Sequence, residues 1–227
     1  MSKIGAAIPI CEQDKDYLPV IFSELDRLDV DVSWLANNCS PETIKNLLSF
    51  ERTKGIREYY GSFHNCLRNY PLENLKALGC DWCIQWDMDE TWEPKAPEKL
   101  REALKDQKMV TVRMAHVWEK GENKFVTMDW ASERDRIFNL KHNWGYLHKV
   151  VAGPTLLDEM TPTMQTADIW MIHWGYSTAE KRKAHKIRWD LNHGHSVGKN
   201  PYGMWKTINE LGYEPKLTDY QKFIKML

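Results

Sequence analysis

The sequence has no long apolar run and few cysteines. No stretch of the 227-residue chain approaches the roughly 18 consecutive apolar residues of a membrane-spanning helix, and the N-terminus lacks the apolar centre of a signal peptide. The five cysteines are odd in number and too few for the disulfide framework of a small secreted domain. We therefore expect a reduced, cytoplasmic protein without a membrane anchor.

The chain also has little net charge. Its 31 basic and 32 acidic side chains give a formal charge of -1, which argues against a dedicated non-specific binder of nucleic acids. The charge is uneven, however: residues 1–50 carry four basic and eight acidic side chains, whereas residues 181–227 carry ten and four. The C-terminal segment therefore fits either a phosphate-bearing partner or a solvated helix face.

Tryptophan is abundant, with 11 residues in 227. An indole ring has an apolar face and one polar group, which suits ligands such as sugars and bases, although most tryptophans in proteins are structural. The composition is otherwise that of a globular protein, with 42% hydrophobic and 28% charged residues. The length predicts one domain, or one domain with an extension.

Strands and helices are predicted to alternate over the first 90 residues. Strands are predicted at 3–10, 30–36, 55–60 and 82–86, and helices at 18–28, 41–50 and 63–78. The alternation predicts a Rossmann-like α/β fold, in which helices flank a mostly parallel sheet. In such sheets, ligands bind at the carboxyl ends of the strands.

The second half of the chain is less regular. A helix is predicted at 97–106, a strand at 109–118, and several short strands over 123–170. Ser177 and Glu180 have the spacing of a capping box, which predicts a basic helix to about residue 191. We expect one domain at 1–176, with a helical extension at 177–227 packed on the same domain.

Asp87 and Asp89 follow the strand predicted at 82–86, where a ligand is expected. Two neighbouring carboxylates repel each other, and a divalent cation with oxygen ligands relieves that repulsion. The alternative is a turn whose acidic residues have no ligand. The preceding strands and helices favour the metal site.

Six separate segments share a pattern with a known family. They are Ile-Pro-Ile-Cys-Glu at 8–12, Asn-Asn-Cys-Ser at 37–40, Arg-Asn at 68–69, Asp-Trp with Trp-Asp-Met-Asp-Glu at 81–90, Arg-Ile-Phe-Asn with Trp-Gly-Tyr at 136–146, and Ile-His-Trp-Gly-Tyr at 172–176. Together they resemble the GT-A fold, family-2-like glycosyltransferases. The Asp-x-Asp-Glu segment is the most specific of the six.

This resemblance implies a metal-dependent glycosyltransferase that uses a nucleotide-sugar donor, with a UDP-sugar expected. It implies Mn²⁺ or Mg²⁺ held by Asp87, Asp89 and His173, with Asp87 and Asp89 also counted as catalytic. The acceptor implied is a saccharide, a protein or modified DNA. The donor-binding residues that we expect are Pro9, Glu12, Asn38, Arg68, Asp87, Trp174, Lys181 and Arg182.

The catalytic base is where the chain departs from the family. The family often has Glu after the histidine that corresponds to His148, but Lys149 stands there. Glu133 and Asp135 could replace this Glu as the catalytic base, judged only by their positions in the sequence. The missing acid also favours an alternative, a catalytically inactive GT-A-shaped binding module.

A further alternative comes from the segment at 87–91. Asp-Met-Asp-Glu-Thr also fits the Asp-x-Asp-x-Thr motif of haloacid-dehalogenase-like phosphatases, in which the first Asp is the nucleophile. That family places the motif on its first strand and needs a second acidic pair downstream. Here 86 residues precede the motif and the chain has no Asp-Asp pair.

Overall fold

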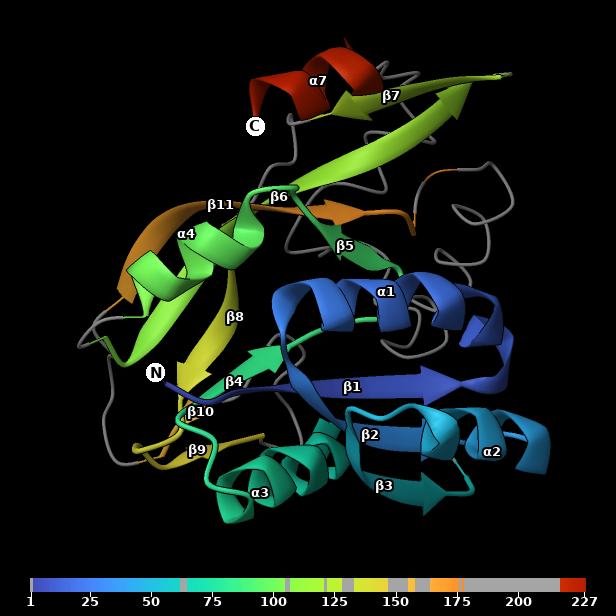
Figure 1. The fold of residues 1–227 in the computed structure, drawn as a ribbon, viewed down its shortest axis with the longest axis vertical. Helices are drawn as coiled ribbons and strands as arrows, with labels where there is room; N and C mark the ends of the chain where they lie inside the picture. The colour runs from blue at the N-terminus through green and yellow to red at the C-terminus, as the bar shows by residue number, and fades with distance from the viewer. Residues whose placement is uncertain are drawn as a thin grey trace, which may run out of the picture.

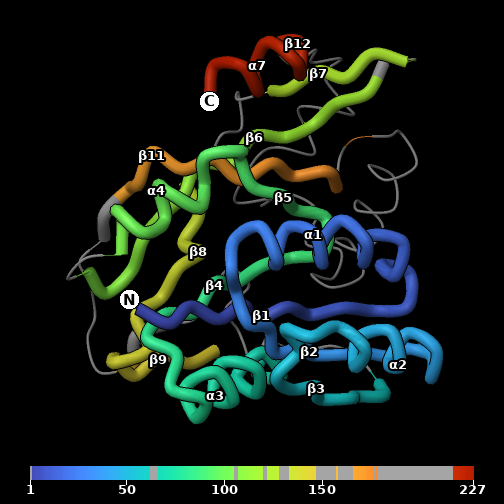
Figure 2. Tube along the Cα trace, viewed as in Figure 1, coloured from blue at the N-terminus to red at the C-terminus, as the bar shows by residue number. Residues whose placement is uncertain are grey.

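The computed structural model of the chain describes residues 2–61, 65–104, 107–120, 122–127, 133–146, 155–157, 164–175, 177 and 217–227. Figure 1 shows the arrangement of its helices and strands. The N-terminus lies at the start of β1, whereas the C-terminus lies with α7 beside β7 at the far end of the sheet (Figure 2).

The first half of the chain forms the parallel part of the sheet. Its elements are β1 (Ile4–Cys11), η1 (Glu12–Tyr17), α1 (Leu18–Leu28), β2 (Asp31–Asn37), α2 (Pro41–Ser49), β3 (Thr53–Tyr59), η2 (Asn65–Arg68), α3 (Asn69–Ala77) and β4 (Trp82–Gln85). β1 pairs in parallel with both β2 and β4, and β2 pairs in parallel with β3 (Figure 1). The predicted fold class, a mostly parallel α/β sheet flanked by helices, is confirmed.

The second half extends this sheet with strands of mixed direction. Its elements are β5 (Glu90–Trp92), α4 (Ala96–Ala103), β6 (Met109–Lys120), β7 (Asn123–Thr127), β8 (Glu133–Asn139), β9 (Trp144–Gly145), β10 (Thr155–Leu156), β11 (Met164–His173), β12 (Thr218–Asp219) and α7 (Tyr220–Met226). The strand order is β12-β7-β6-β8-β4-β1-β2-β3, and β11 pairs with β6 and β5. β5 was not predicted, because three residues are too few to show a period. The helix predicted from Ser177 to about 191 lies outside the described residues.

Helices pack against apolar side chains on both faces of the sheet. Ile8 and Ile10 of β1 belong to one cluster with Leu25 of α1 and Leu47 of α2. Ala7, which points to the opposite face, belongs to a second cluster that also contains Leu72 and Leu75 of α3. The central strands are therefore covered on both sides, as a parallel sheet requires.

The described C-terminal residues pack on the same sheet. β12 pairs with β7, and Phe223 of α7 is buried against Trp170 of β11, with their ring centroids 5.4 Å apart. The longest described helix, α1, has 11 residues, and no described helix has the length and apolar character needed to cross a membrane.

The start of α2 follows the sequence signal that predicted it. Ser40 is the N-cap, and its hydroxyl oxygen accepts a hydrogen bond from the backbone N–H of Thr43 at 3.2 Å. Pro41 occupies the first helical position, where its missing N–H leaves no helical hydrogen bond unmade.

Ser40→Ala should lower the free energy of unfolding by about 1 kcal/mol, because the substitution leaves a helical N–H without its acceptor. Ser49→Ala at the other end of α2 is the matched control, since this exposed hydroxyl only donates to the carbonyl of Asn46. Urea unfolding of both variants measures the difference. Equal losses in the two variants would contradict the capping role.

Candidate active site

The candidate site lies where the carboxyl ends of the parallel strands β1, β2 and β4 share one edge of the sheet. β4 ends at Gln85, and the chain then turns between Asp87 and Glu90, where the N–H of Glu90 donates to the carbonyl of Asp87 at 3.2 Å. β5 begins at Glu90 and pairs with β11. Asp87 and Asp89 are therefore held in a turn between two strands, at the place predicted for a ligand.

Two arginines hold the Asp87 carboxylate. Arg68 Nη2 lies 3.1 Å from Asp87 Oδ1, and Arg136 Nη2 lies 3.2 Å from Asp87 Oδ2. Burial alone would raise the pKa of Asp87, but the two guanidiniums outweigh it and hold the pKa well below its usual range. Asp87 is thus a fixed anion whose charge is balanced by side chains of the chain itself.

Glu90 is a second, more deeply buried carboxylate in this network. It is 1% exposed, forms an ion pair with Arg136 and accepts a hydrogen bond from the N–H of Asp87 at 3.1 Å. Burial, with the neighbouring Asp87 and Asp89, raises the pKa of Glu90 against the opposing effect of Arg136. Arg136 therefore forms ion pairs with both Asp87 and Glu90.

β8 has a β-bulge at Arg136, whose side chain lies in the site. In the β6–β8 ladder Ile137 pairs with Val110, and the next pair joins Asp135 to Thr111, so the ladder passes over Arg136. Extra residues of this kind re-aim a side chain and are common beside active sites.

Gln85 and Asn69 complete the surroundings of the two arginines. In the amide orientation that gives each end a complementary neighbour, Gln85 accepts from Arg68 Nη1 at 3.1 Å and from Arg136 Nη1 at 3.2 Å. Asn69 exchanges two hydrogen bonds with the backbone of Tyr146, at 2.6 and 3.1 Å. The Arg-Asn pair at 68–69 therefore joins the acidic turn to the segment after β9.

Asp89 and His173 form a separate pair on the other side of the turn. His173 Nε2 lies 3.4 Å from Asp89 Oδ2, and the backbone N–H of Trp174 donates to the carbonyl of Asp89 at 2.7 Å. Burial opposes protonation of His173, but the Asp89 carboxylate outweighs it and raises the pKa. On its far side, His173 Nδ1 lies 3.0 Å from His116 Nδ1.

Gly175 leaves the space in which Asp89 and His173 meet. A Cβ atom at this position would lie 2.3 Å from Asp89 Oδ2 and 2.7 Å from His173 Nε2, closer than real side chains approach. A carboxylate oxygen and an imidazole nitrogen are ligands that Mn²⁺ accepts. Asp89 and His173 therefore fit the predicted metal as two of its ligands.

The described residues contain no group of three His, Cys, Asp or Glu side chains arranged to hold a metal ion. Both Asp87 oxygens face guanidiniums, so its metal role stays a prediction. Remaining ligands would have to come from a bound diphosphate, from water or from outside the described part of the chain.

Glu12 and Asn38, predicted to bind the donor, make structural contacts. Glu12 Oε2 accepts from the N–H of Ser40 at 2.8 Å and from the hydroxyl of Thr43 at 2.9 Å, so Glu12 joins the end of β1 to the start of α2. Asn38 has a positive φ of 52° and exchanges two hydrogen bonds with the backbone of Gly61. Their predicted contacts with a donor stay predictions.

Trp174, also predicted to bind the donor, bridges two parts of the fold. Its Nε1 donates to Thr91 Oγ1 at 2.9 Å, and its ring lies 5.6 Å from the ring of Tyr220 and 5.3 Å from Lys124 Nζ, measured to the ring centroid. Pro9 is partly buried within β1, where it pairs with Leu35.

The two substitutes for the catalytic base are exposed residues of β8. Asp135 Oδ1 accepts a hydrogen bond from Thr111 Oγ1 at 3.0 Å, and Glu133 pairs with Arg113 of β6. Lys181, Arg182 and the segment around Lys149 lie outside the described residues.

Sequence reasoning missed Glu90, Arg136 and His116 as members of the site. Glu90 and Arg136 stand within two of the segments that resemble the family, so their motifs were the available signal. His116 has no such signal, because it lies among the apolar residues of β6 and only the pairing with β11 brings it to His173.

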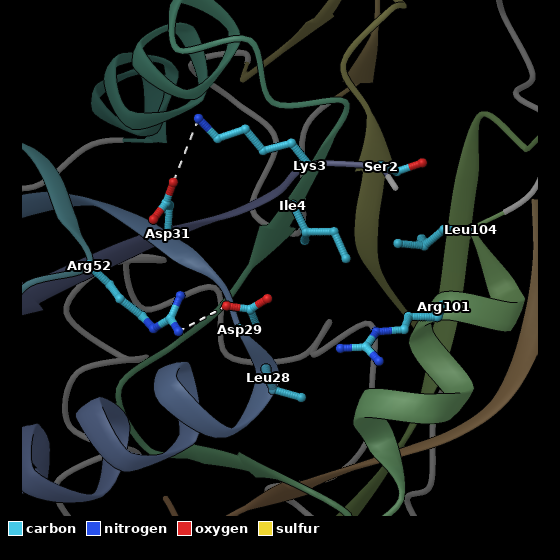
Figure 3. A pocket seen from close by; sticks show the side chains of 9 residues that line it. All are labelled: Ser2, Lys3, Ile4, Leu28, Asp29, Asp31, Arg52, Arg101 and Leu104. Carbon is cyan, nitrogen blue, oxygen red and sulfur yellow. Dashed lines mark ion pairs between the residues drawn. The ribbon is translucent and has the colours of Figure 1, made fainter.

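A cavity of about 500 Å³ lies at the opposite end of the sheet (Figure 3). It is lined by residues near the starts of β1 and β2, among them Ile4 and Asp31. Arg52 in its wall pairs with Asp29 at 2.9 Å, and Lys3 with Asp31 at 3.6 Å (Figure 3). Its position at the amino ends of the strands and its paired charges distinguish it from the candidate site.

The pKa of Glu12 gives a pH test of its structural role. Hydrogen bonds from the N–H of Ser40, the hydroxyl of Thr43 and Lys15 lower the pKa from 4.5 to about 2. Because the folded-state pKa is depressed, the stabilisation is fully present above pH 4.5 and is lost as the pH falls towards 2.

The melting temperature of Glu12→Gln should therefore lie below that of the parent at pH 7, and the difference between the two melting temperatures should narrow below pH 4.5. Glu42→Gln, at an exposed position in α2, is the matched control, and a gap of Glu12→Gln that stays constant with pH would contradict the role.

No protein-family model and no curated protein matches the sequence. Solved structures that overlap it include S. aureus TarS 1-349 in complex with UDP-GlcNAc, at 11% identity and a TM-score of 0.47 over 72% of this chain and 58% of that one. HddC from Yersinia pseudotuberculosis overlaps 83% of this chain and 100% of its own, at 9% identity and a TM-score of 0.44. The chain spans about half the length of the TarS 1-349 structures, 47% in one and 58% in another. At these identities and TM-scores the overlaps assign neither a family nor an activity to the chain.

Proposed function

We propose that this protein is a glycosyltransferase that moves a sugar from a nucleotide-diphosphate donor, expected to be a UDP-sugar, and that it requires Mn²⁺ or Mg²⁺. The observation that carries the proposal is the meeting of Asp89 and His173 across the space left by Gly175, at the carboxyl edge of the sheet. The resemblance of six segments to GT-A glycosyltransferases supports the same reading. We also propose that residues 1–176 form the catalytic domain, that the extension adds Lys181 and Arg182 to it, and that the protein is cytoplasmic.

In this proposal Asp89 and His173 hold the cation, which when bound offsets the negative charge of the donor diphosphate. Arg68 and Arg136 hold Asp87 beside them. Because Arg68 is the more exposed of the two guanidiniums, with 18% of its side chain accessible against 9% for Arg136, we assign it the contact with an incoming phosphate. The cations Lys181 and Arg182 are proposed to stabilise the leaving diphosphate as well.

The remaining parts of the proposal rest on the sequence. Pro9, Asn38 and Trp174 are proposed to border the donor, and Glu133 or Asp135 to act as the base. The acceptor is proposed to be a saccharide, a protein or modified DNA. The basic residues in 181–227 favour a phosphate-bearing acceptor among these three.

The phosphatase alternative is weakened by the contacts of Asp87. A carboxylate whose two oxygens face Arg68 and Arg136 is a poor nucleophile, because attack would require it to leave both guanidiniums. The motif also follows the fourth strand and not the first. An inactive binding module is the remaining alternative.

Hydrolysis of UDP-sugars and of a phosphomonoester, each measured with and without Mn²⁺, tests the proposal against both alternatives. We expect slow, Mn²⁺-dependent release of UDP from one of the sugar nucleotides. Release of phosphate from the monoester would favour the phosphatase. Mn²⁺-dependent binding of a UDP-sugar without turnover would favour the binding module.

Asp89→Ala should reduce turnover of the sugar nucleotide on the order of a hundredfold or more, because the variant loses a carboxylate that holds the cation. Asp168→Ala is the matched control, since this exposed carboxylate of β11 contacts Lys99 and Arg113. Full activity of the parent protein in excess EDTA would contradict the metal requirement.

Gly175→Ala should weaken Mn²⁺ binding by about tenfold or more, because the new methyl group would separate Asp89 from His173. Mn²⁺ affinity follows from the electron paramagnetic resonance signal of the free ion, without donor or acceptor. Gly79→Ala provides the control, because a Cβ there meets nothing within 4 Å and its positive φ of 73° affects stability only. Unchanged Mn²⁺ affinity in Gly175→Ala would contradict the role of Gly175 in keeping the metal site open.

A further inference from the structure

His116 lies directly behind His173, on the neighbouring strand. β6 and β11 pair in parallel with His116 opposite His173, so the two rings emerge from adjacent strands at one level of the sheet. Their centroids are 5.0 Å apart at an interplanar angle of 84°, and the two Nδ1 atoms are 3.0 Å apart. His116 is 2% exposed and His173 is 8% exposed, so this contact is shielded from solvent.

A hydrogen bond between two Nδ1 atoms needs one proton, carried by one ring and accepted by the other. If His116 donates, the Nδ1 of a neutral His173 is the acceptor and its Nε2–H faces Asp89. If His116 accepts and His173 is neutral, His173 carries its proton on Nδ1, and its Nε2 turns a lone pair towards Asp89 and the space beside Gly175. A lone pair facing a carboxylate 3.4 Å away is repulsive unless a cation lies between them.

We propose that His116 is a positioning residue, which accepts the Nδ1–H of His173 and thereby presents the Nε2 lone pair to the cation. This inference rests on the metal requirement of the proposed function. Histidine ligands usually donate their second N–H to a carboxylate, a carbonyl or water, and that partner fixes the tautomer and the ring orientation. Here the imidazole of His116 is the hydrogen-bond partner. The register between β6 and β11 places His116 opposite His173, so the orientation of the His173 ring depends on this strand pairing.

A purely structural histidine pair is the competing explanation, and variants at position 116 separate the two. His116→Asn keeps a polar atom near the place of Nδ1 and can still accept the hydrogen bond. His116→Leu has a similar size but offers no acceptor. His142→Leu, in the turn after β8, is the control for the loss of a histidine elsewhere in the chain.

The first readout is Mn²⁺ affinity without donor, measured by electron paramagnetic resonance. We expect His116→Leu to weaken it by about 10- to 100-fold, as for other partners of metal-binding histidines. We expect His116→Asn and His142→Leu to stay within about threefold of the parent, a margin below that range. The second readout uses the ¹⁵N-labelled parent protein in the presence of Mg²⁺, in which the shared proton should show its one-bond ¹⁵N–¹H coupling to Nδ1 of His173, and Nε2 of His173 should carry no proton.

The outcomes separate this inference from the function on which it rests. If the parent binds Mn²⁺ and His116→Leu binds it equally well, the inference is overturned and the metal site stands. If the parent binds no Mn²⁺, both are overturned. Should His116→Leu fail to fold, the comparison of His116→Asn with the parent and the ¹⁵N spectrum decide, and a shared proton bonded to Nδ1 of His116 overturns the inference.

Discussion

The site depends on the burial of a glutamate carboxyl group at the start of β5. Glu90 is 1% exposed, and an isolated carboxylate at such a place would be strongly unfavourable. Arg136 meets this requirement from β8, which pairs with β4, and also contacts Asp87. Removing one partner from a buried pair of this kind costs about 3–5 kcal/mol, so the turn, β5 and β8 are held in one arrangement. The geometry of Asp87 and Asp89 follows from that arrangement.

Within this arrangement the acidic turn has two chemically different sides. On one side Asp87 is balanced by Arg68 and Arg136, and Gln85 fixes the guanidiniums. On the other side Asp89 meets a histidine across a space kept open by a glycine. For the nucleotide-diphosphate donor that we propose, one side would offer a cation site and the other side hydrogen-bond donors.

The described C-terminal residues also contribute to the site, through Trp174. This residue follows His173, and its ring lies between Thr91 of β5 and Tyr220 of α7. Phe223 of the same helix is buried against Trp170 of β11. α7 therefore packs on the strand that carries His173, which connects the end of the chain to the geometry of the candidate metal ligands.

The sequence by itself determined the local structure and the place of the site. Apolar runs marked β1, β2 and β4, Ser40 marked the start of α2, and the acidic residues after a buried strand marked the edge where we propose a ligand site, because these signals act over a few neighbouring residues. The tertiary structure decided which charges meet. Arg136 reaches Glu90 across 46 residues and His116 reaches His173 across 57, and such pairings follow from strand order and register. It also placed Asp87 between two arginines, because the charges that surround a side chain come from residues that lie far away in the sequence.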